Sequence, residues 1–397
     1  MGEIMKKTIR DFDLSGKKVL IRCDFNVPII DGKITDDTRI VASLDTIKYA
    51  ISRGAKVILF SHLGRVKTEE DLVKNNLEIV SVRLSELLNQ PVYFSNVTRG
   101  EELEDKVNSL KVGEVLLVQN TRYEDLEGKK ESSNDLELGK YWASLGDIFI
   151  NDAFGTAHRA HASNVGIATN LPSGVGFLIE KELNALSSLD NPERDFVVIL
   201  GGSKVSDKIG LIENLVTKVD KLVIGGGMAF TFLKAKGINV GKSIVDVDNI
   251  DFCKRVLNEY SDKILLPVDV HVTSEFSNDV PSRNVSVNDI LENEMGLDLG
   301  VESINNIIRL LESAKTVFWN GPLGVYEFEK YRLATKKVLE YLVSTEKQVI
   351  LGGGDIVACA SNLGYKDKVT HASTGGGATL EYLEGKILPG IDIIQDK

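Results

Sequence analysis

Short, mostly apolar runs that end abruptly in polar residues recur along the chain, and each of them predicts a strand buried on both faces. Segments of helical period separate these runs, and one helix face carries Ile40, Leu44, Ile47 and Ile51. Strands that alternate with helices predict a mostly parallel sheet with helices on both faces. The strands predicted in the first half of the chain are residues 19–22, 57–60, 92–94, 115–118 and 148–150.

The same alternation starts again after a break between residues 171 and 190. This break contains Pro172, Gly174 and Gly176 and leads into a single apolar-periodic helix, which is typical of a connector between domains. The predicted fold class is therefore α/β, with two doubly wound, Rossmann-like lobes, each built on a parallel sheet, joined by a hinge helix. The strands predicted in the second half are residues 196–200, 222–224, 264–266, 317–319, 349–351 and 369–372.

Polar and basic residues follow the strands predicted in the first half. Asp24 and Asn26 come after the first strand, which Pro28 stops. Because the carboxyl ends of parallel strands face the ligand crevice, both side chains are expected there, although an Asx-turn capping the strand would use the same residues. Arginine matches the geometry of carboxylate and phosphate, so we expect a pocket for a small, multiply anionic molecule. The basic residues expected at this rim are Arg39, His62, Arg65, Arg122 and Arg159.

Glycine-rich turns follow the strands predicted in the second half. Glycine lets backbone N–H groups approach a bound group closely, and a helix that begins there adds the positive end of its dipole, so the two together favour phosphate. A single run of this kind can also be an ordinary tight turn, but runs at successive strand ends predict a phosphate site. These runs are residues 201–204, 225–227, 320–324, 352–355 and 373–377.

Two lysines and one carboxylate complete the predicted phosphate site. Lys204 and Lys208 are expected on the first turn of a helix, where a cation is mildly unfavourable unless a phosphate is bound beside it. Asp355 is the candidate carboxylate for Mg²⁺, because Mg²⁺ on a nucleotide takes one or two carboxylates together with the phosphates. The alternative for Asp355 is an N-cap of the helix that follows.

Composition and motif spacing exclude several classes of protein. A length of 397 residues predicts two or three domains, and a net charge of -11 argues against a nucleic-acid partner. The absence of a long apolar run argues against a membrane partner, and three scattered cysteines are typical of a reduced, cytoplasmic protein. Residues 236–243 look like a Walker loop, but only three residues separate its glycines where four are required. His158 and His161 have metal-like spacing without further ligands nearby, so zinc is not expected.

An anion pocket in one half and a phosphate site in the other predict phosphoryl transfer between a nucleotide and a small anion. No general base stands beside the arginines, which fits a carboxylate acceptor, because its pKa of about 4 leaves it ionised at neutral pH. Two rival functions stay open on this reasoning. One is a kinase for a shorter acid such as acetate, and the other is a non-catalytic, two-lobed protein that binds anions.

The motifs of this chain resemble those of the phosphoglycerate kinase family, in family order and over almost the whole length. They are residues 22–28, 61–65, 152–161, 201–208 and 319–322 and the two late glycine runs. The resemblance implies a glycolytic and gluconeogenic enzyme with Mg²⁺ and ATP or ADP. It would transfer a phosphoryl group reversibly between ATP and the carboxylate of 3-phosphoglycerate, giving 1,3-bisphosphoglycerate and ADP. It also implies a monomer.

Site residues are carried over from the family position by position. The resemblance implies that 3-phosphoglycerate is bound by Asp24, Asn26, Arg39, His62, Arg65, Arg122 and Arg159. It implies that the transferring phosphoryl group is stabilised by Arg39 and Lys208 and by the backbone at Gly354 and Gly376. For the nucleotide it implies Gly202, Lys204, Lys208, Gly225, Gly226, Gly296, Asn320, Glu327, Gly353, Gly354 and Asp355, with Asp355 also at the metal.

The resemblance also implies a division of the chain. Residues 1–172 would form the lobe that binds 3-phosphoglycerate, 173–189 the hinge helix, 190–380 the nucleotide lobe, and 381–397 a segment that returns to the first lobe. Lobe closure about the hinge would keep water from the acyl phosphate. Four positions depart from the usual family residues: Ile356 replaces a residue that often carries a hydroxyl, and Gln119, Val66 and Ser203 replace Glu, Pro and Ala.

Overall fold

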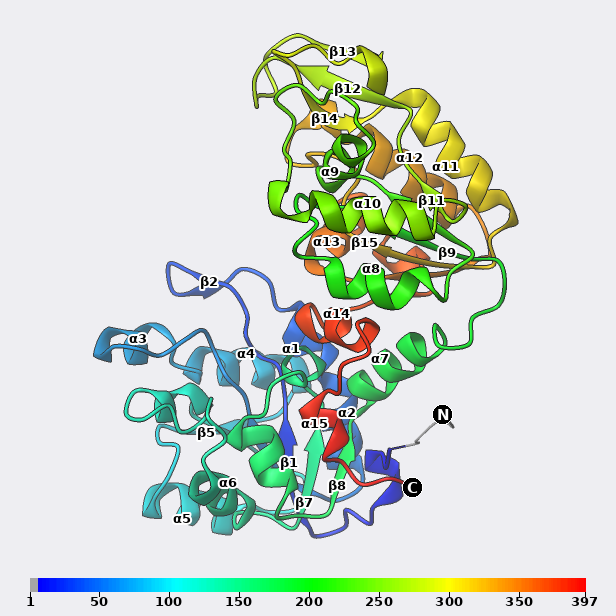
Figure 1. The fold of residues 1–397 in the computed structure, drawn as a ribbon. Helices are drawn as coiled ribbons and strands as arrows, with labels where there is room; N and C mark the ends of the chain where they lie inside the picture. The colour runs from blue at the N-terminus through cyan, green and yellow to red at the C-terminus, as the bar shows by residue number, and fades with distance from the viewer. Residues whose placement is uncertain (1–5) are drawn as a thin grey trace. The chain divides into compact units, whose positions relative to one another are not determined.

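The computed structural model describes residues 6–397, which divide into two compact units (Figure 1). The first unit runs to Asn184 and also takes in Ile387–Lys397, and the second unit is Ala185–Lys386. Each unit contains one six-stranded sheet in which every pair of neighbouring strands is parallel. The predicted α/β class with two parallel sheets is confirmed. No helix in the described part of the chain has the length and apolar character needed to cross a membrane.

The first sheet has the order β5-β6-β4-β1-β7-β8, with β1 (Lys18–Arg22) between β4 (Lys56–Phe60) and β7 (Ile148–Asn151). The chain winds from β1 toward one edge and from β7 toward the other. The carboxyl ends of β1 and β7 therefore flank the point where the winding reverses, which is where ligands bind in such sheets. The other strands of this unit are β5 (Val92–Ser95), β6 (Val115–Val118), β8 (Ser173–Val175) and the hairpin strands β2 (Ile29–Ile30) and β3 (Lys33–Ile34).

Two elements of the first unit differ from the prediction. The single helix predicted after residue 38 is divided into α1 (Thr38–Ala42) and α2 (Leu44–Ser52), because the N–H of Ser43 bonds to the carbonyl of Ile40, three residues back. Part of the predicted connector forms the edge strand β8, whose Gly174 packs so closely on Phe12 that an added Cβ would lie 2.7 Å from the ring. The other helices are α3 (Glu69–Lys74), α4 (Glu78–Leu88), α5 (Glu101–Ser109), α6 (Leu136–Ala143), α7 (Phe177–Ser187) and α15 (Pro389–Asp392).

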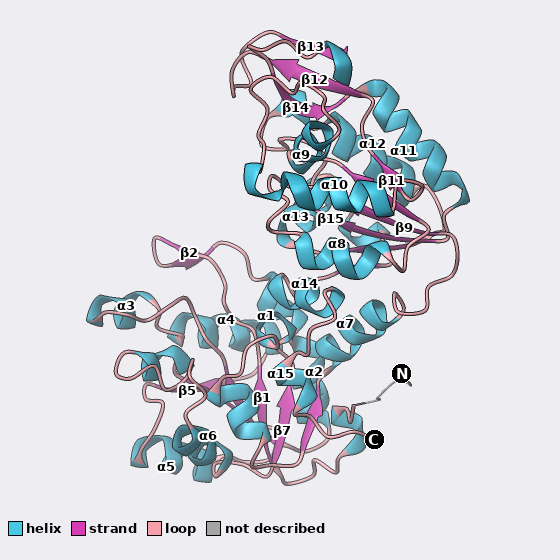
Figure 2. Ribbon diagram, in the orientation of Figure 1, coloured by secondary structure: helices cyan, strands magenta, loops and turns pink. Residues whose placement is uncertain are grey.

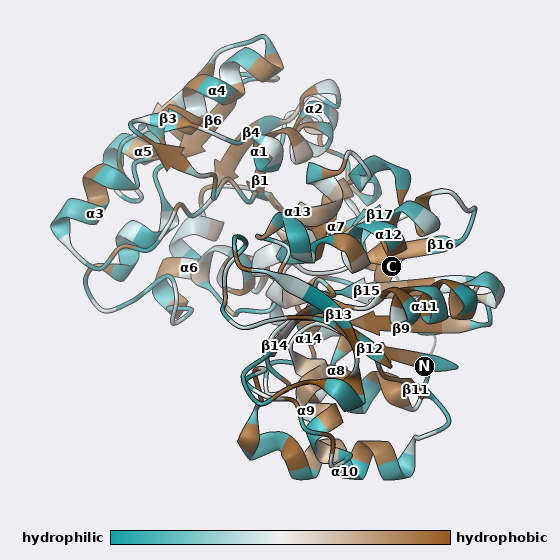
Figure 3. Ribbon diagram, turned by 90° about the horizontal axis from the view of Figure 1, so that it is seen from above, coloured by the Kyte–Doolittle hydropathy of each residue, from teal (hydrophilic) through white to brown (hydrophobic). Residues whose placement is uncertain are grey.

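The second sheet has the order β11-β10-β9-β15-β16-β17 and is wound in the same way, with its reversal between β9 (Phe196–Leu200) and β15 (Thr316–Asn320). Figure 2 shows helices packed around the strands of each sheet, and Figure 3 shows the hydrophobic character of strands such as β9. The other strands of this sheet are β10 (Lys221–Ile224), β11 (Ile264–Leu265), β16 (Gln348–Leu351) and β17 (His371–Ala372). The helices are α8 (Ile209–Val216), α9 (Met228–Ala235), α10 (Ile250–Glu259), α11 (Val301–Ser313), α12 (Leu333–Val343), α13 (Gly354–Asn362) and α14 (Gly377–Leu383).

A small antiparallel sheet in the second unit was not predicted. It has the order β13-β12-β14 and consists of β12 (Asp269–Thr273), β13 (Ser282–Ser286) and β14 (Met295–Leu299). In β12 and β14 apolar residues alternate with other residues, as Val270 and Val272 do on either side of His271 and Leu297 and Leu299 do on either side of Asp298. A prediction based on continuous apolar runs misses such strands. Val270 and Val272 form a separate small core with Phe230 and Leu233 of α9.

Candidate functional site

Asp24 and Arg39 form an ion pair just beyond the carboxyl end of β1. The Arg39 Nη1 donates to the Asp24 Oδ2 over 2.6 Å, while Asp24 Oδ1 accepts the N–H of Asn26 at 3.2 Å. The Asx-turn that the sequence left as an alternative is therefore present together with the ion pair. Burial by itself would raise the pKa of Asp24, but the charges around it, among them Arg39 with its hydrogen bond and Arg22, hold this pKa below its usual value. Asp24 is therefore a carboxylate that keeps Arg39 at the rim.

Asn26 ties the loop after β1 to the loop after β4. Its Oδ1 accepts the N–H of Gly64 over 2.8 Å. The next residue, Arg65, is exposed, and its carbonyl accepts a hydrogen bond from the Asn75 Nδ2 at 2.9 Å. An added Cβ at Gly64, which has a φ of +59°, would lie 2.8 Å from the Asn75 Oδ1, so this close packing requires glycine. The backbone that carries Arg65 is thus fixed while its guanidinium extends into solvent.

His62 and Arg122 belong to the same cluster of charges. Burial, and then the positive charge of Arg22, lowers the pKa of His62 to about 3, so that His62 is neutral at physiological pH. Arg122 lies in the 3-10 turn η2 (Thr121–Asp125), and its Nη1 contacts the Asp125 carboxylate at 3.0 Å. The Arg122 Nε is buried and makes no hydrogen bond within the described residues. A buried donor of this kind needs an acceptor, which an anionic ligand would supply.

Arg159 lies after the turn η3 (Phe154–Thr156) and is exposed. The structure therefore places Asp24, Arg39, His62 and Arg122 together through contacts or charge interactions. Arg65 and Arg159 have exposed side chains and lie on loops at the carboxyl edge of the same sheet.

A cavity of about 660 Å³ opens at the carboxyl ends of β9, β10, β15 and β16 in the second unit. Five of the residues predicted for the nucleotide line it: Gly202, Gly226, Gly296, Glu327 and Asp355. Much of its wall is apolar, with few polar groups, a composition typical of a site for a flat organic ligand. The apolar wall residues include Phe230, Ile244, Met295, Leu297 and Phe328.

Asn320, the last residue of β15, connects two of the glycine-rich turns beside this cavity. Its Nδ2 donates to the carbonyl of Gly352, and the Lys208 ammonium group donates to its Oδ1. Burial lowers the pKa of Lys208, although the Asp355 carboxylate acts in the opposite direction. Gly353 has a φ of +103°, and an added Cβ there would lie 2.4 Å from the Asn320 Nδ2. The start of α13 can thus approach Asn320 and Lys208 only because residue 353 has no side chain.

Asp355 stands in the first turn of α13 and does not cap it. The N-cap of this helix is Gly353, which provides no side-chain cap, and the first helical N–H groups are left for another acceptor. Asp355 lines the cavity beside them. Within residues 6–397 no group of three or more potential metal-ligating side chains is found. One free carboxylate next to a phosphate-binding helix start suits a Mg²⁺ ion carried by a nucleotide.

The prediction that Lys204 and Lys208 share the first turn of a helix is wrong. The helix α8 begins only at Ile209, so Lys208 is its N-cap and Lys204 lies in the preceding loop. The reason is the turn after β9, where Gly202 has a φ of +108° and the N–H of Lys208 bonds to the carbonyl of Val205. Lys204 is consequently exposed, whereas Lys208 is half-buried against Asn320.

Four of the predicted glycines lie at turns and helix starts rather than in the cavity wall, and one of them is Gly353, the N-cap of α13. Gly354 is the first residue of α13, Gly376 is the N-cap of α14 with a φ of +52°, and Gly225 follows β10. An added Cβ at Gly225 would lie 2.4 Å from the side chain of Leu323, so this glycine is required by packing.

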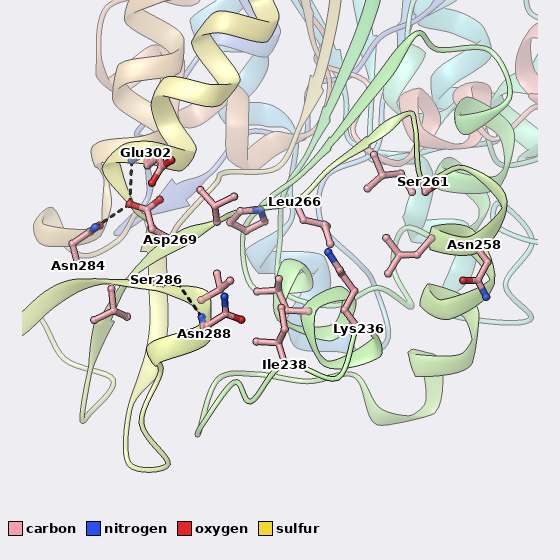
Figure 4. A pocket seen from close by; sticks show the side chains of 17 residues that line it. Lys236, Ile238, Asn258, Ser261, Leu266, Asp269, Asn284, Ser286, Asn288 and Glu302 are labelled. Carbon is pink, nitrogen blue, oxygen red and sulfur yellow. Dashed lines mark hydrogen bonds between the residues drawn. The ribbon is translucent and has the colours of Figure 1, made fainter.

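A second cavity of the second unit has a volume of about 850 Å³. It lies between the ends of α9 and α10 and the strands β12 and β13, and it shares no lining residue with the cavity beside Asp355 (Figure 4). Its carboxylate Asp269 is already bonded to Asn284 at 2.9 Å and to the N–H of Glu302 at 3.0 Å, at the start of α11. Lys236 is its only lysine, and no glycine lines it. This cavity therefore lacks the features of a phosphate site.

Sequence reasoning missed several residues of the 660 Å³ cavity. Phe230 and Ile244 lie outside the predicted strand ends, and Met295 and Leu297 belong to the unpredicted strand β14. Lys242, in the motif set aside as a false Walker loop, also lines this cavity, and its Nζ donates to the carbonyl of Ser274. The signal that the sequence gives near Lys242 is the pair of glycines in this motif, Gly237 and Gly241.

The four positions that depart from the usual family residues fall into two groups, three that are buried and one that is exposed. Ile356 is fully buried in the core of the second unit, Val66 is buried, and Gln119 uses its Oε1 to accept the N–H groups of Leu77 and Asn120. Ser203, in contrast, is exposed and lines the cavity. Ser203 is therefore the departure that faces the candidate nucleotide site.

The comparisons with known proteins that follow all match this chain to the same family. A family model described as phosphoglycerate kinase matches residues 9–386. The phosphoglycerate kinase of Listeria monocytogenes is 58% identical over 394 residues, which are 99% of this chain and 100% of that protein. The phosphoglycerate kinase of Enterococcus faecalis is 58% identical over 395 residues, with the same coverage.

Solved structures agree with these matches. The phosphoglycerate kinase from Coxiella burnetii has a TM-score of 0.88 and 38% sequence identity to this chain, covering 98% of both chains. The phosphoglycerate kinase from Pyrococcus horikoshii OT3 has a TM-score of 0.84 and 32% identity, again covering 98% of both chains.

Proposed function

The chain belongs to the phosphoglycerate kinase family, and from this premise we propose which residues bind each substrate and which stabilise the transferring phosphoryl group. As a member of that family it is a kinase that transfers a phosphoryl group reversibly between ATP and the carboxylate of 3-phosphoglycerate, giving 1,3-bisphosphoglycerate and ADP. Family membership decides against a kinase for a shorter acid and against a non-catalytic binding protein. The assignment of residues to substrates is the proposal.

We place 3-phosphoglycerate at the carboxyl ends of β1 and β4, bound by Asp24, Asn26, Arg39, His62, Arg65, Arg122 and Arg159. The observation that carries this assignment is the buried Arg122 Nε, which lacks a hydrogen-bond partner within the described residues and belongs to a side chain whose charge acts on His62. A carboxylate or phosphate oxygen would satisfy that donor and be neutralised by the arginines. Arg65 and Arg159 are exposed and would complete the charge balance on the outer side of the ligand.

We place the nucleotide in the 660 Å³ cavity, with its base against the apolar wall and its phosphates at the start of α13. The first N–H groups of that helix would donate to phosphate oxygens. Asp355 would hold the Mg²⁺ ion that the nucleotide carries, and the ion would neutralise part of the phosphate charge. The other nucleotide contacts proposed are Gly202, Lys204, Lys208, Gly225, Gly226, Gly296, Asn320, Glu327, Gly353 and Gly354.

In the transfer step, a carboxylate oxygen of 3-phosphoglycerate forms a bond to the γ-phosphorus while the bond between that phosphorus and the β–γ bridging oxygen breaks. No proton has to be removed, because the acceptor is already ionised. Arg39 and Lys208 stabilise the negative charge on the transferring group, together with backbone N–H groups at Gly354 and Gly376. Arg39 leaves Asp24 or shares its guanidinium between Asp24 and the phosphoryl group.

We further propose that the chain works as a cytoplasmic monomer with no nucleic-acid or membrane partner. In this proposal residues 1–172 bind 3-phosphoglycerate, 190–380 bind the nucleotide, 173–189 form the hinge, and 381–397 return to the first lobe.

Acyl phosphate formation can be followed by coupling it to NADH oxidation through glyceraldehyde-3-phosphate dehydrogenase. We expect turnover that requires 3-phosphoglycerate and Mg·ATP and that is lost when EDTA removes the metal. The same assay with Asp355→Asn tests the proposed metal contact: its requirement for Mg²⁺ should shift to higher concentrations. An unchanged Mg²⁺ requirement in this variant would remove Asp355 from the metal site.

A further inference from the structure

A buried charged network lies directly beneath the proposed 3-phosphoglycerate site. Arg22, the last residue of β1, is 1% exposed, and Glu131 and Ser163 are fully buried. The Arg22 Nε donates to the Ser163 Oγ over 2.8 Å, and the Ser163 hydroxyl and N–H both donate to the Glu131 carboxylate. The Arg22 Nη2 lies 4.0 Å from the Glu131 Oε1. Each charge is thus balanced inside the protein, as a buried ion pair requires.

The remaining donor of Arg22 faces His62. The Arg22 Nη2 lies 3.3 Å from the His62 Nδ1, and the Nη1 donates to the carbonyl of Cys23. A guanidinium group has donors only and keeps its proton in proteins. In a hydrogen bond between these two groups, the His62 Nδ1 must therefore be the acceptor, and the ring proton must sit on Nε2.

The charges around His62 keep this ring neutral. Burial and the positive charge of Arg22 lower its pKa, Arg122 and Arg39 act in the same direction, and only the Asp24 carboxylate opposes them. The Nε2 makes no hydrogen bond within the described residues. The ring therefore offers one N–H donor on the side away from Arg22 and no positive charge of its own.

We propose that Arg22, supported by Ser163 and Glu131, is a positioning residue that holds His62 as its Nε2–H tautomer, so that this N–H donates to an anionic oxygen of 3-phosphoglycerate. The inference deepens the proposed function and rests on its assignment of His62 to that substrate. Without Arg22, a neutral histidine would populate both tautomers, and the one protonated at Nδ1 would present a lone pair to the anion. Arg22 itself touches no substrate in this proposal.

Two variants of His62 separate the two ring nitrogens. The amide nitrogen of glutamine reaches close to the position of Nε2, whereas that of asparagine reaches only close to Nδ1. We expect His62→Gln to keep much of the affinity for 3-phosphoglycerate, and His62→Asn to raise the KM for this substrate by about tenfold or more, the value of one hydrogen bond to a charged group. Equal losses in both variants, or a better asparagine variant, would contradict an Nε2–H donor.

A double variant tests the role of Arg22 without leaving a buried charge unpaired. Arg22→Met with Glu131→Leu removes both partners of the ion pair, a replacement that buried pairs often tolerate. We expect a folded protein, judged by its far- and near-ultraviolet circular dichroism. Its KM for 3-phosphoglycerate should be raised while its KM for Mg·ATP is unchanged. An unchanged KM for 3-phosphoglycerate in the folded double variant would overturn the positioning role.

The direct test needs no variant of the network. The wild-type protein, labelled with ¹⁵N at its five histidines, is examined by NMR, and the His62 signals are identified by their loss in His62→Gln. We expect an unprotonated Nδ1 and a protonated Nε2, unchanged from about pH 5.5 to 8.5, and a shift of the Nε2 signal on addition of 3-phosphoglycerate. A protonated Nδ1, or a ring that titrates in this range, would overturn the tautomer proposal. The expected tautomer without a response to 3-phosphoglycerate, in protein that turns the substrate over, would instead contradict the assignment of His62 to the substrate.

Discussion

The exposed arginine Arg65, on the loop after β4, is expected to govern substrate binding more than turnover. Arg65 is exposed, and its backbone is held by Asn75, so Arg65→Ala removes a charge without disturbing the loop. We expect the KM for 3-phosphoglycerate to rise about tenfold, with kcat changed by less than about threefold. Steady-state kinetics with saturating Mg·ATP measure both. Arg53→Ala, an exposed arginine at the amino end of β4, is the control that should leave both parameters unchanged.

At this scale the sequence identified charged residues better than it identified their contacts. Asp24, Arg39, His62 and Arg122 could be placed together because each follows a predicted strand or begins a predicted helix. That Asn26 would bond to the loop of Gly64, or that Gln119 would bond to Leu77, could not be predicted, because these contacts depend on the direction of side chains between distant segments. Ile356 shows the same limit: its position suggested a place beside the phosphates, yet its side chain is buried in the core.

Substitutions at the two ends of α13 offer a matched test of the glycine-rich turn at residues 352–355, which is proposed to bind phosphate. Gly353→Ala strains a residue with a φ of +103° and brings a Cβ to 2.4 Å from the Asn320 Nδ2, so it should displace Asn320 and with it Lys208. We expect the affinity for Mg·ADP, measured by isothermal titration calorimetry, to fall by about tenfold or more.

Gly364→Ala, just beyond the other end of α13, serves as the control. Gly364 has a φ of +71° but no atom within 4 Å of an added Cβ. This change should therefore lower the free energy of unfolding by about 1–2 kcal/mol without altering ADP affinity. Equal effects of the two substitutions on ADP binding would contradict the role given to the turn at Gly353.

Two buried carboxyl groups at helix starts predict a dependence of stability on pH. Asp152 accepts the N–H of Leu178 in α7, and Asp298 accepts the N–H of Ala334 in α12. Burial raises the pKa of each to about 7. The folded protein therefore binds these protons more tightly than the unfolded chain, and the stabilisation present below about pH 4 is lost as the pH rises toward 7.

Asp152→Asn and Asp298→Asn remove this titration while keeping an oxygen acceptor at each helix start. Relative to the wild type, each variant should gain free energy of unfolding as the pH is raised from about 4 to 7. Urea unfolding at several pH values measures the difference, and Asp105→Asn on the exposed face of α5 is the control. A difference between variant and wild type that does not vary with pH would argue against the raised pKa values.

The elements that were predicted correctly are those with a simple pattern. Continuous apolar runs identified strands of both parallel sheets, because such strands are buried on both faces. The antiparallel strands β12–β14 escaped because none of them is a continuous apolar run: apolar residues alternate with others in β12 and β14, and β13 contains a single apolar residue, Val285. The strand β8 escaped because Ser173 and Gly174 carry no apolar signal, and Gly174 packs closely on Phe12. The break of a helix at Ser43 depends on one backbone hydrogen bond, which no periodicity reveals.

The two units repeat the same arrangement, a six-stranded parallel sheet with one reversal of its winding. Each unit reverses its winding once, and each places its chemistry at the carboxyl ends of the strands beside that reversal: arginines and acids in the first unit, glycine turns, Lys208 and Asp355 in the second. The two-lobed α/β fold could be predicted because both halves show the same alternation of strands and helices. The identity of the acceptor could not be derived from spacing alone, since arginine clusters suit any small anion, and it came from the family motifs.

The central claim is that Arg39 acts on the transferring phosphoryl group rather than on substrate binding alone. The measurement that tests it most directly is the coupled assay on Arg39→Ala, with Arg39→Lys beside it, at saturating and limiting 3-phosphoglycerate. We predict that kcat falls by about 10²–10³-fold in Arg39→Ala, far more than any change in KM, and that lysine restores part of the loss. A variant with wild-type kcat and only a raised KM would contradict the claim and reduce Arg39 to a binding residue.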